Sequence, residues 1–311
     1  MCPLRDSVLA APAFVDRHNV WVVLPFSLVS PGFSGPDVTP AYSWSFEPTV
    51  VFPTLILCVL YGLAWRRARR SGSVHAPGYG RLSMFALSMA LVVVALLSPI
   101  DSLGDDDLLV MHMVQHMILL DLVPITLILS LNKVLLRPVT RRIQVIERRA
   151  GFFGSPVFAV LAYVAGVYAW HVPAAYDLAL RHDWIHALEH LTFSAVGTLY
   201  WWHVLSPIRA RRRLTGLGPL AYMVTTKLFI GALGIALSFL PRVIYAFYAH
   251  KPDYWGLTPQ EDQSMAGLVM ALEQSLVMGV AFVYLIYKFF DEAAAEQRRR
   301  ERLEDLTAAG G

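Results

Sequence analysis

Apolar residues run along this chain in long stretches, and short connections between them hold most of the charged residues. Each stretch is close to the length, about 20 residues, that an α-helix needs to cross the hydrocarbon core of a bilayer. The pattern predicts an all-α integral membrane protein, a bundle of about seven transmembrane helices. The predicted spans lie near residues 48–65, 82–99, 107–131, 155–172, 184–205, 219–240 and 264–290.

The connections between the predicted spans alternate in charge. Lys and Arg are concentrated in the connections 66–81, 132–154 and 206–218 and in the C-terminal segment, whereas the connections between these hold few basic residues. Basic loops are retained on the cytoplasmic side of a membrane. We therefore expect the N-terminus to lie outside and the C-terminus in the cytoplasm.

The chain is expected to form one membrane domain with an extension at each end. Residues 1–45 hold a short apolar run interrupted by Pro25, which indicates an outer N-terminal extension at the membrane interface. Residues 46–290 form the seven-helix membrane domain. Residues 291–311 form a charged cytoplasmic tail, which we expect to continue the last helix into solvent.

Composition supports a membrane protein and excludes other classes. Apolar residues make up 56% of the chain, charged residues 16%, and the mean hydropathy is +0.50, outside the range of soluble domains. A net charge of +3 is too small to indicate a nucleic-acid partner. Cys2 and Cys58 lie too far apart in sequence for a Cys-x-x-Cys metal site. A metal ion would therefore need His, Met, Asp or Glu ligands.

Histidines gather on the outer side of the predicted bundle. His112 and His116 lie one turn apart on one face of the third span, about 8 and 14 Å below its outer end. His182, His186 and His190 repeat this spacing at the outer end of the fifth span. Ionisable residues within spans turn toward the bundle interior. We expect the two helices to face each other and to form a metal site from these five histidines.

Nearby residues are candidates to support this site. Met117 is the methionine nearest to the His116 turn and a candidate thioether ligand, while Glu189 and Asp121 are candidates to neutralise or orient the ligands. Imidazole with thioether favours copper as Cu(I), with zinc as the alternative. A monovalent ion also costs less free energy to bury than a divalent one.

Other chemistries fit the histidines less well. One haem between the two helices is possible, but two are not, because ligands four residues apart rise only about 6 Å. The segment "HALEH" at 186–190 matches the H-x-x-E-H pattern of a class of zinc proteases. A second histidine pair on another helix favours a binding or transfer site instead. We therefore expect a protein without catalytic residues. No polar line continues into the inner half, which disfavours transport and favours a site loaded from outside.

Four sequence blocks resemble, in this order, the multi-spanning CtaG family of bacterial cytochrome c oxidase assembly factors. They are "HMVQHMILLDLVP", "HALEHLTFSAVGTLYWWHVL", "GALGIALSFLPRVIYAFYA" and "WGLTPQEDQSMAGLVM", and the resemblance extends from about residue 45 to about 290. It implies a protein of the bacterial cytoplasmic (inner) membrane that supplies copper to the catalytic subunit of a haem-copper oxidase, with an extracytoplasmic copper donor as a further partner.

The resemblance also assigns individual positions. His112, His116, His186, Glu189 and His190 fall in its two histidine-bearing blocks. Where the family commonly has Trp and Pro, this chain has "ALEQ", and its Glu273 is expected as an extra polar contact of the site. The alternatives are a membrane-embedded zinc metalloenzyme and a structural oxidase partner without metal. The outer-loop block contributes Trp255, Gly256, Asp262, Gln263, Ala266 and Gly267.

Overall fold

The computed structural model describes residues 42–208, 214 and 216–309. In this part of the chain the regular structure is helical, apart from an isolated bridge between Tyr254 and Leu257. The all-α prediction is confirmed, and the predicted N-terminal extension 1–45 lies almost entirely outside the described residues. The helices are α1 (Pro48–Arg70), α2 (Tyr79–Leu96), α3 (Pro99–Asp106), α4 (Leu109–Met117), the π-helical η1 (Ile118–Leu122), α5 (Val123–Ser130), α6 (Lys133–Ala150), the 3-10 turn η2 (Gly151–Gly154), α7 (Pro156–Trp170), α8 (Pro173–Ala179), α9 (Asp183–Leu205), α10 (Gly218–Phe239) and α11 (Pro259–Ala309).

Helices occupy all of the predicted places, although not all of them have the length and composition of a span. Among the described residues, 5 helices are long and apolar enough to cross a membrane. A sixth results if α6 and η2 are joined to α7, from which they are bent by 64°. α9 has 23 residues, but its histidines and acidic residues make it less apolar. The seven-span topology and the orientation of the termini stay predictions.

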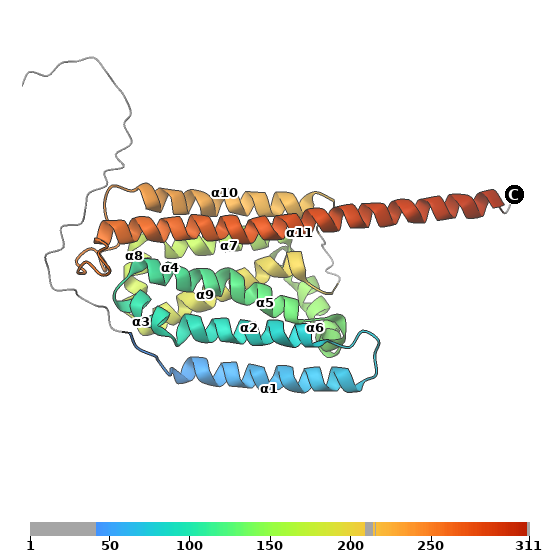
Figure 1. Ribbon diagram of the computed structural model, residues 1–311, viewed down its shortest axis with the longest axis horizontal. Helices are drawn as coiled ribbons and strands as arrows, with labels where there is room; N and C mark the ends of the chain where they lie inside the picture. Colours follow the sequence, from blue (N-terminus) through green and yellow to red (C-terminus); the bar gives the residue numbers. More distant parts are fainter. Residues whose placement is uncertain (1–41, 209–213, 215, 310–311) are drawn as a thin grey trace, which may run out of the picture. The chain divides into compact units, whose positions relative to one another are not determined.

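The outward side chains of the long helices are apolar. In α1, Phe52 and Leu60 are 65% and 58% exposed, and Val280 of α11 is 73% exposed. Apolar surface of this extent is rare on soluble proteins, and lipid would cover it in a membrane. Figure 1 shows α1 at the edge of the bundle beside α2, and α11 continuing beyond the other helices toward the C-terminus.

The centre of the bundle is built on α11 and on the rod formed by α4, η1 and α5. α11 packs along α10 and against α4, while α9 contacts α7, η1 and α5 (Figure 1). One apolar cluster surrounds Tyr163, Tyr200 and Trp201, and another includes Met113 and Tyr248. The histidines of α4 lie beside this second cluster, because Tyr248 also contacts His112.

A π-helical turn interrupts the third predicted span. Pro124 lacks the N–H group that would bond to the carbonyl of Leu120 in a regular α-helix. Just before it, the N–H of Val123 bonds to the carbonyl of Ile118, five residues earlier, which is the hydrogen bond of a π-helix. Gly197 of α9 lies directly against this turn. A Cβ atom at Gly197 would overlap the carbonyl group of Leu120, whose carbonyl carbon lies only 2.8 Å from the ideal Cβ position. Only glycine therefore allows α9 to pack this closely.

Gly197→Ala is expected to push α9 away from η1 and to lower the stability of the detergent-purified protein, because overpacking costs about 1–3 kcal/mol. Gly62→Ala in α1 is the matched control, since nothing lies within 4 Å of its ideal Cβ position and alanine favours the helix. Thermal unfolding followed by circular dichroism compares the two. An unfolding temperature of Gly197→Ala equal to that of the wild type would contradict the close contact.

Candidate metal site

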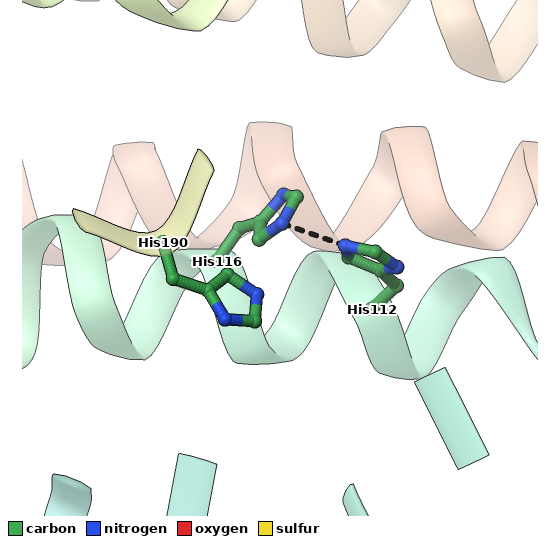
Figure 2. Close-up of side chains that lie close together, drawn as sticks. All are labelled: His112, His116 and His190. Atoms are coloured by element: carbon green, nitrogen blue, oxygen red, sulfur yellow. Dashed lines mark hydrogen bonds between the residues drawn. The ribbon is translucent and has the colours of Figure 1, made fainter. Parts of the chain in front are cut away.

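Two histidine pairs face each other between α4 and α9. His112 and His116 lie one turn apart on α4, and His186 and His190 lie one turn apart on α9. The ring centroids of His112 and His186 are 5.1 Å apart, and those of His116 and His190 are 5.6 Å apart. Figure 2 shows His112, His116 and His190 close together, with the first two joined by a hydrogen bond. The helical spacing thus gathers four imidazoles into one place.

Ligand atoms in the cluster are close enough to share one ion. One nitrogen from each of His112, His116 and His190 lies within 4.8 Å of the others. The Nε2 atoms of His112 and His116 are 2.7 Å apart, whereas two nitrogens bound about 2.0 Å from one tetrahedral ion are about 3.3 Å apart. A bound ion would therefore separate these two rings by a small side-chain rotation.

A tyrosine fixes which nitrogen of His112 is free to bind. The hydroxyl of Tyr248 donates a hydrogen bond to the backbone carbonyl of Gly104 and lies 3.2 Å from Nδ1 of His112. Because its proton is engaged, the hydroxyl accepts from His112, which places the imidazole proton on Nδ1. The lone pair on Nε2 of His112 then points toward His116, as a metal ligand requires.

Glu189 places a carboxylate beside the two histidines of α4. Its oxygens lie 3.7 Å from Nε2 of His116 and 4.0 Å from Nε2 of His112, and its side chain is 1% exposed. Because Glu189 and His190 are consecutive residues, both approach the cluster from the same turn of α9. An ionised carboxylate here offsets the positive charge of a cation held by neutral imidazoles.

Several buried polar atoms of the cluster lack hydrogen-bond partners within the described part of the chain. Leaving such an atom unpaired costs about 1–3 kcal/mol, so a cluster of them indicates a group that binds there. Imidazole nitrogens with a carboxylate are a donor set that suits copper and zinc, and the residues present fit such an ion. The unpaired atoms are Nδ1 of His116, Nε2 of His186, Nε2 of His190 and both carboxylate oxygens of Glu189.

A second group of ligand atoms overlaps the first. Ligand atoms of Asp105, His112 and His186 also lie within 4.8 Å of one another. Asp105 comes from α3, and its Oδ2 atom is 3.4 Å from Nδ1 of His186. The aspartate follows Gly104, where an added Cβ would lie 2.9 Å from the backbone of His112. Close packing of α3 on α4 therefore brings this carboxylate to the cluster.

The outer-loop block holds the start of α4 in place. The carboxylate of Asp262 accepts hydrogen bonds from the backbone N–H groups of Leu109 at 2.7 Å and Val110 at 3.0 Å. Gln263 accepts from the N–H of Ile244 and donates to the carbonyl of Arg242, which fixes the segment leading to Tyr248. Asp262 thus supplies the helix cap that α4 itself lacks, and Gln263 fixes the neighbouring loop. They position the histidines without contacting them.

Two predicted site residues lie away from the cluster. His182 is exposed at the residue before α9 and belongs to neither group of ligand atoms. Met117 is 4% exposed and packs in the apolar cluster that includes Met113 and Tyr248. The i, i+4 spacing placed His182 on the stripe of His186 and His190, but the helix begins only at Asp183. The structure therefore brings together four of the five predicted histidines, and their role as metal ligands stays a prediction.

Asp121 and Glu273, both predicted to support the site, belong to a separate buried network. On a regular α-helix Asp121 would lie about 140° around from His116, but the π turn rotates it into the bundle. There it accepts hydrogen bonds from Trp201 at 2.6 Å, Gln274 at 2.8 Å and Tyr163 at 2.9 Å. Gln274 also donates to Glu273 at 3.0 Å. Four helices thus converge on two carboxyl groups deeper in the bundle.

Sequence reasoning missed several residues around the histidines. His171 follows α7, and its ring centroid is 6.4 Å from that of His116. Tyr176 of α8 packs 5.1 Å from His112, centroid to centroid. A single histidine and a single tyrosine carry no spacing signal, so only the fold reveals them. Asp105 had a signal, because its acidic run immediately precedes the helix that carries His112.

Fold and site together define a helical membrane protein with a buried cluster of histidines and carboxylates. A family model described as cytochrome c oxidase caa3 assembly factor (Caa3_CtaG) matches residues 59–292. The chain belongs to this family. The family resemblance drawn from the four sequence blocks is therefore confirmed.

Two uncharacterized mycobacterial proteins are similar to nearly the whole chain. The one from Mycobacterium leprae is 23% identical over 327 residues, which cover 97% of this chain and 48% of that protein. The one from Mycobacterium bovis is 24% identical over 326 residues, with coverages of 97% and 47%. The chain thus spans about half the length of these relatives. No solved structure matches it significantly.

Tyr248→Phe is expected to weaken zinc or Cu(I) binding by about tenfold, because losing the partner that orients a metal-binding histidine costs 10–100-fold in affinity. Competition with a coloured chelator measures the affinity. Tyr245→Phe is the matched control, since its hydroxyl is also buried but bonds to the carbonyl of His171. Equal affinities of the two variants would contradict the tautomer assigned to His112.

Proposed function

We propose that this protein binds copper between α4 and α9 and delivers it to the catalytic subunit of a haem-copper oxidase. Its family consists of cytochrome c oxidase assembly factors, so an oxidase is the expected acceptor. The observation that carries the proposal is the cluster of four imidazoles beside Glu189, three of them buried, in which ligand atoms lie unpaired within the described residues. A copper donor on the extracytoplasmic side and the lipid bilayer complete the proposed partners.

The proposed setting is the cytoplasmic membrane of a bacterium. The protein crosses it seven times, with its N-terminus outside, its C-terminus in the cytoplasm and its histidines toward the extracytoplasmic side. The alternation of basic connections supports this orientation. The position of His112 near the start of α4, just after the acidic connection 100–106, supports the placement of the site.

Charge favours Cu(I) as the cargo. Neutral imidazoles with one ionised Glu189 carry a net charge of −1, which a monovalent cation cancels. The side chains of His112, His116 and Glu189 are at most 1% exposed, and an uncompensated charge in such a place is costly. A divalent zinc ion would leave one positive charge there unless Asp105 also bound it.

Release follows from the small number of ligands in the buried set. An ion held by two or three of the nitrogens of His112, His116 and His190 has an open coordination position. A ligand of the acceptor protein can occupy that position before a histidine leaves. Transfer then proceeds by ligand exchange, with each bond to copper replaced as it breaks and no change in oxidation state.

The proposal predicts that the detergent-purified wild type binds Cu(I) and that His112→Ala, His116→Ala and His190→Ala each lower its affinity by at least tenfold, since each removes a ligand. His182→Ala, at the exposed residue just before the helix of His190, is the control and should bind as the wild type does. Chelator competition and elemental analysis of the protein measure binding. Absence of bound copper in the wild type would contradict the proposal.

Two further results separate the alternatives. A membrane metalloenzyme that uses the H-x-x-E-H segment needs Glu189 as its base, so Glu189→Gln would abolish its activity. In a copper carrier that variant should still bind Cu(I), with reduced affinity. A structural oxidase partner without metal would support normal oxidase activity in cells when His112, His116, His186 and His190 are all replaced by alanine.

A further inference from the structure

We propose that Asp105, His112 and His186 form a second metal position, which receives the cation from the aqueous side and passes it to the buried set of His112, His116 and His190. This inference rests on the proposed function, because it requires the buried set to hold metal. It adds a carboxylate ligand and a direction of transfer to that function. The two groups of ligand atoms share only His112.

Exposure to solvent distinguishes the two positions. The side chains of Asp105 and His186 are 32% and 13% exposed, whereas those of His112 and His116 are 0% and 1% exposed. A hydrated ion that arrives from water therefore reaches Asp105 and His186 first. We call Asp105, His112 and His186 the outer set. We call His112, His116 and His190 the inner set, so that His112 belongs to both.

The outer set has free ligand atoms on a fixed scaffold. Oδ1 of Asp105 and Nε2 of His186 are buried and lack hydrogen-bond partners among the described residues. The carboxylate is held in place because α3 packs on the backbone of His112 at Gly104, and Tyr248 bonds to the carbonyl of Gly104. Asp105 and His186 thus each offer one unpaired ligand atom at a fixed position, and the two together can bind a cation.

Charge around Asp105 attracts cations to this position. Asp101, Asp106 and Asp183 all lie close enough to Asp105 to interact with it electrostatically. Negative charge at the mouth of a site raises the local concentration of cations and speeds their association. Beside the inner set, Glu189 places its carboxylate 3.7 Å from His116 and 4.0 Å from His112.

The chemistry of the ligands gives the transfer its direction. The outer set binds through one carboxylate oxygen and two imidazoles, whereas the inner set binds through three imidazoles, which hold a soft ion such as Cu(I) more tightly. The ring centroids of His186 and His190 are 4.1 Å apart. Bonds to Asp105 and His186 can therefore break as bonds to His116 and His190 form, while His112 stays bound throughout. The ion keeps its charge and no electron moves.

Asp105→Asn tests the inference, and Asp106→Asn is the matched control, since it removes the same charge from the next, exposed residue. The rate at which the full-length protein in detergent takes Cu(I) from a coloured chelator is followed by stopped-flow absorbance. We expect Asp105→Asn to load about tenfold more slowly than Asp106→Asn and to reach the same final copper content. Thermal unfolding confirms that both variants are folded.

Equilibrium zinc binding provides a second test. The double variant His116→Ala with His190→Ala lacks the inner set and should still bind one zinc ion weakly, and adding Asp105→Asn should abolish that binding. Equal loading rates of Asp105→Asn and Asp106→Asn would overturn the inference, as would loss of copper from Asp105→Asn at equilibrium. A wild type that binds no copper would instead overturn the proposed function.

Discussion

Four imidazoles and a carboxylate can be buried in an apolar bundle only if their polar atoms are paired or bind a cation, and the surrounding structure depends on this constraint. Asp262 caps the start of α4, the helix that carries His112 and His116. Tyr248 fixes the tautomer of His112 and ties it to α3 through Gly104. His116, His186, His190 and Glu189 keep unpaired buried atoms within the described residues. A bound ion is the simplest explanation of the burial of these atoms in one cluster.

The glycines show how closely the helices must approach for this cluster to form. Gly104 brings α3 onto the backbone of His112, and Gly197 brings α9 onto the π turn below His116. Both contacts bring separate helices against the rod that carries the first histidine pair. A side chain at Gly104 would move Asp105 away from the α4 pair, and one at Gly197 would move the histidines of α9 away from it. The geometry of the ligands therefore depends on the close packing of the helices.

The sequence predicted the helices and the two facing histidine pairs of the site. Helix positions followed from apolar length, and the facing pairs of His112 with His116 and His186 with His190 followed from helical periodicity and similar depth. Asp121 could not be placed, because Pro124 can be accommodated by a kink or by a π turn, and only the π turn rotates Asp121 toward Trp201. His171 and Tyr248 reach the cluster through long-range packing, which no local pattern encodes. Asp105 had a signal in the acidic run before α4, but only the packing of α3 on α4 shows that it reaches His186.

X-ray absorption spectroscopy of the Cu(I)-loaded protein tests the central claim most directly, because it reports the atoms bound to the ion. The account predicts two or three nitrogen neighbours at about 2.0 Å, as for imidazole ligands, with the multiple scattering of imidazole rings and without sulfur. A sulfur neighbour at about 2.3 Å would place the ion at a methionine such as Met117 instead. That result would contradict a site built from His112, His116 and His190.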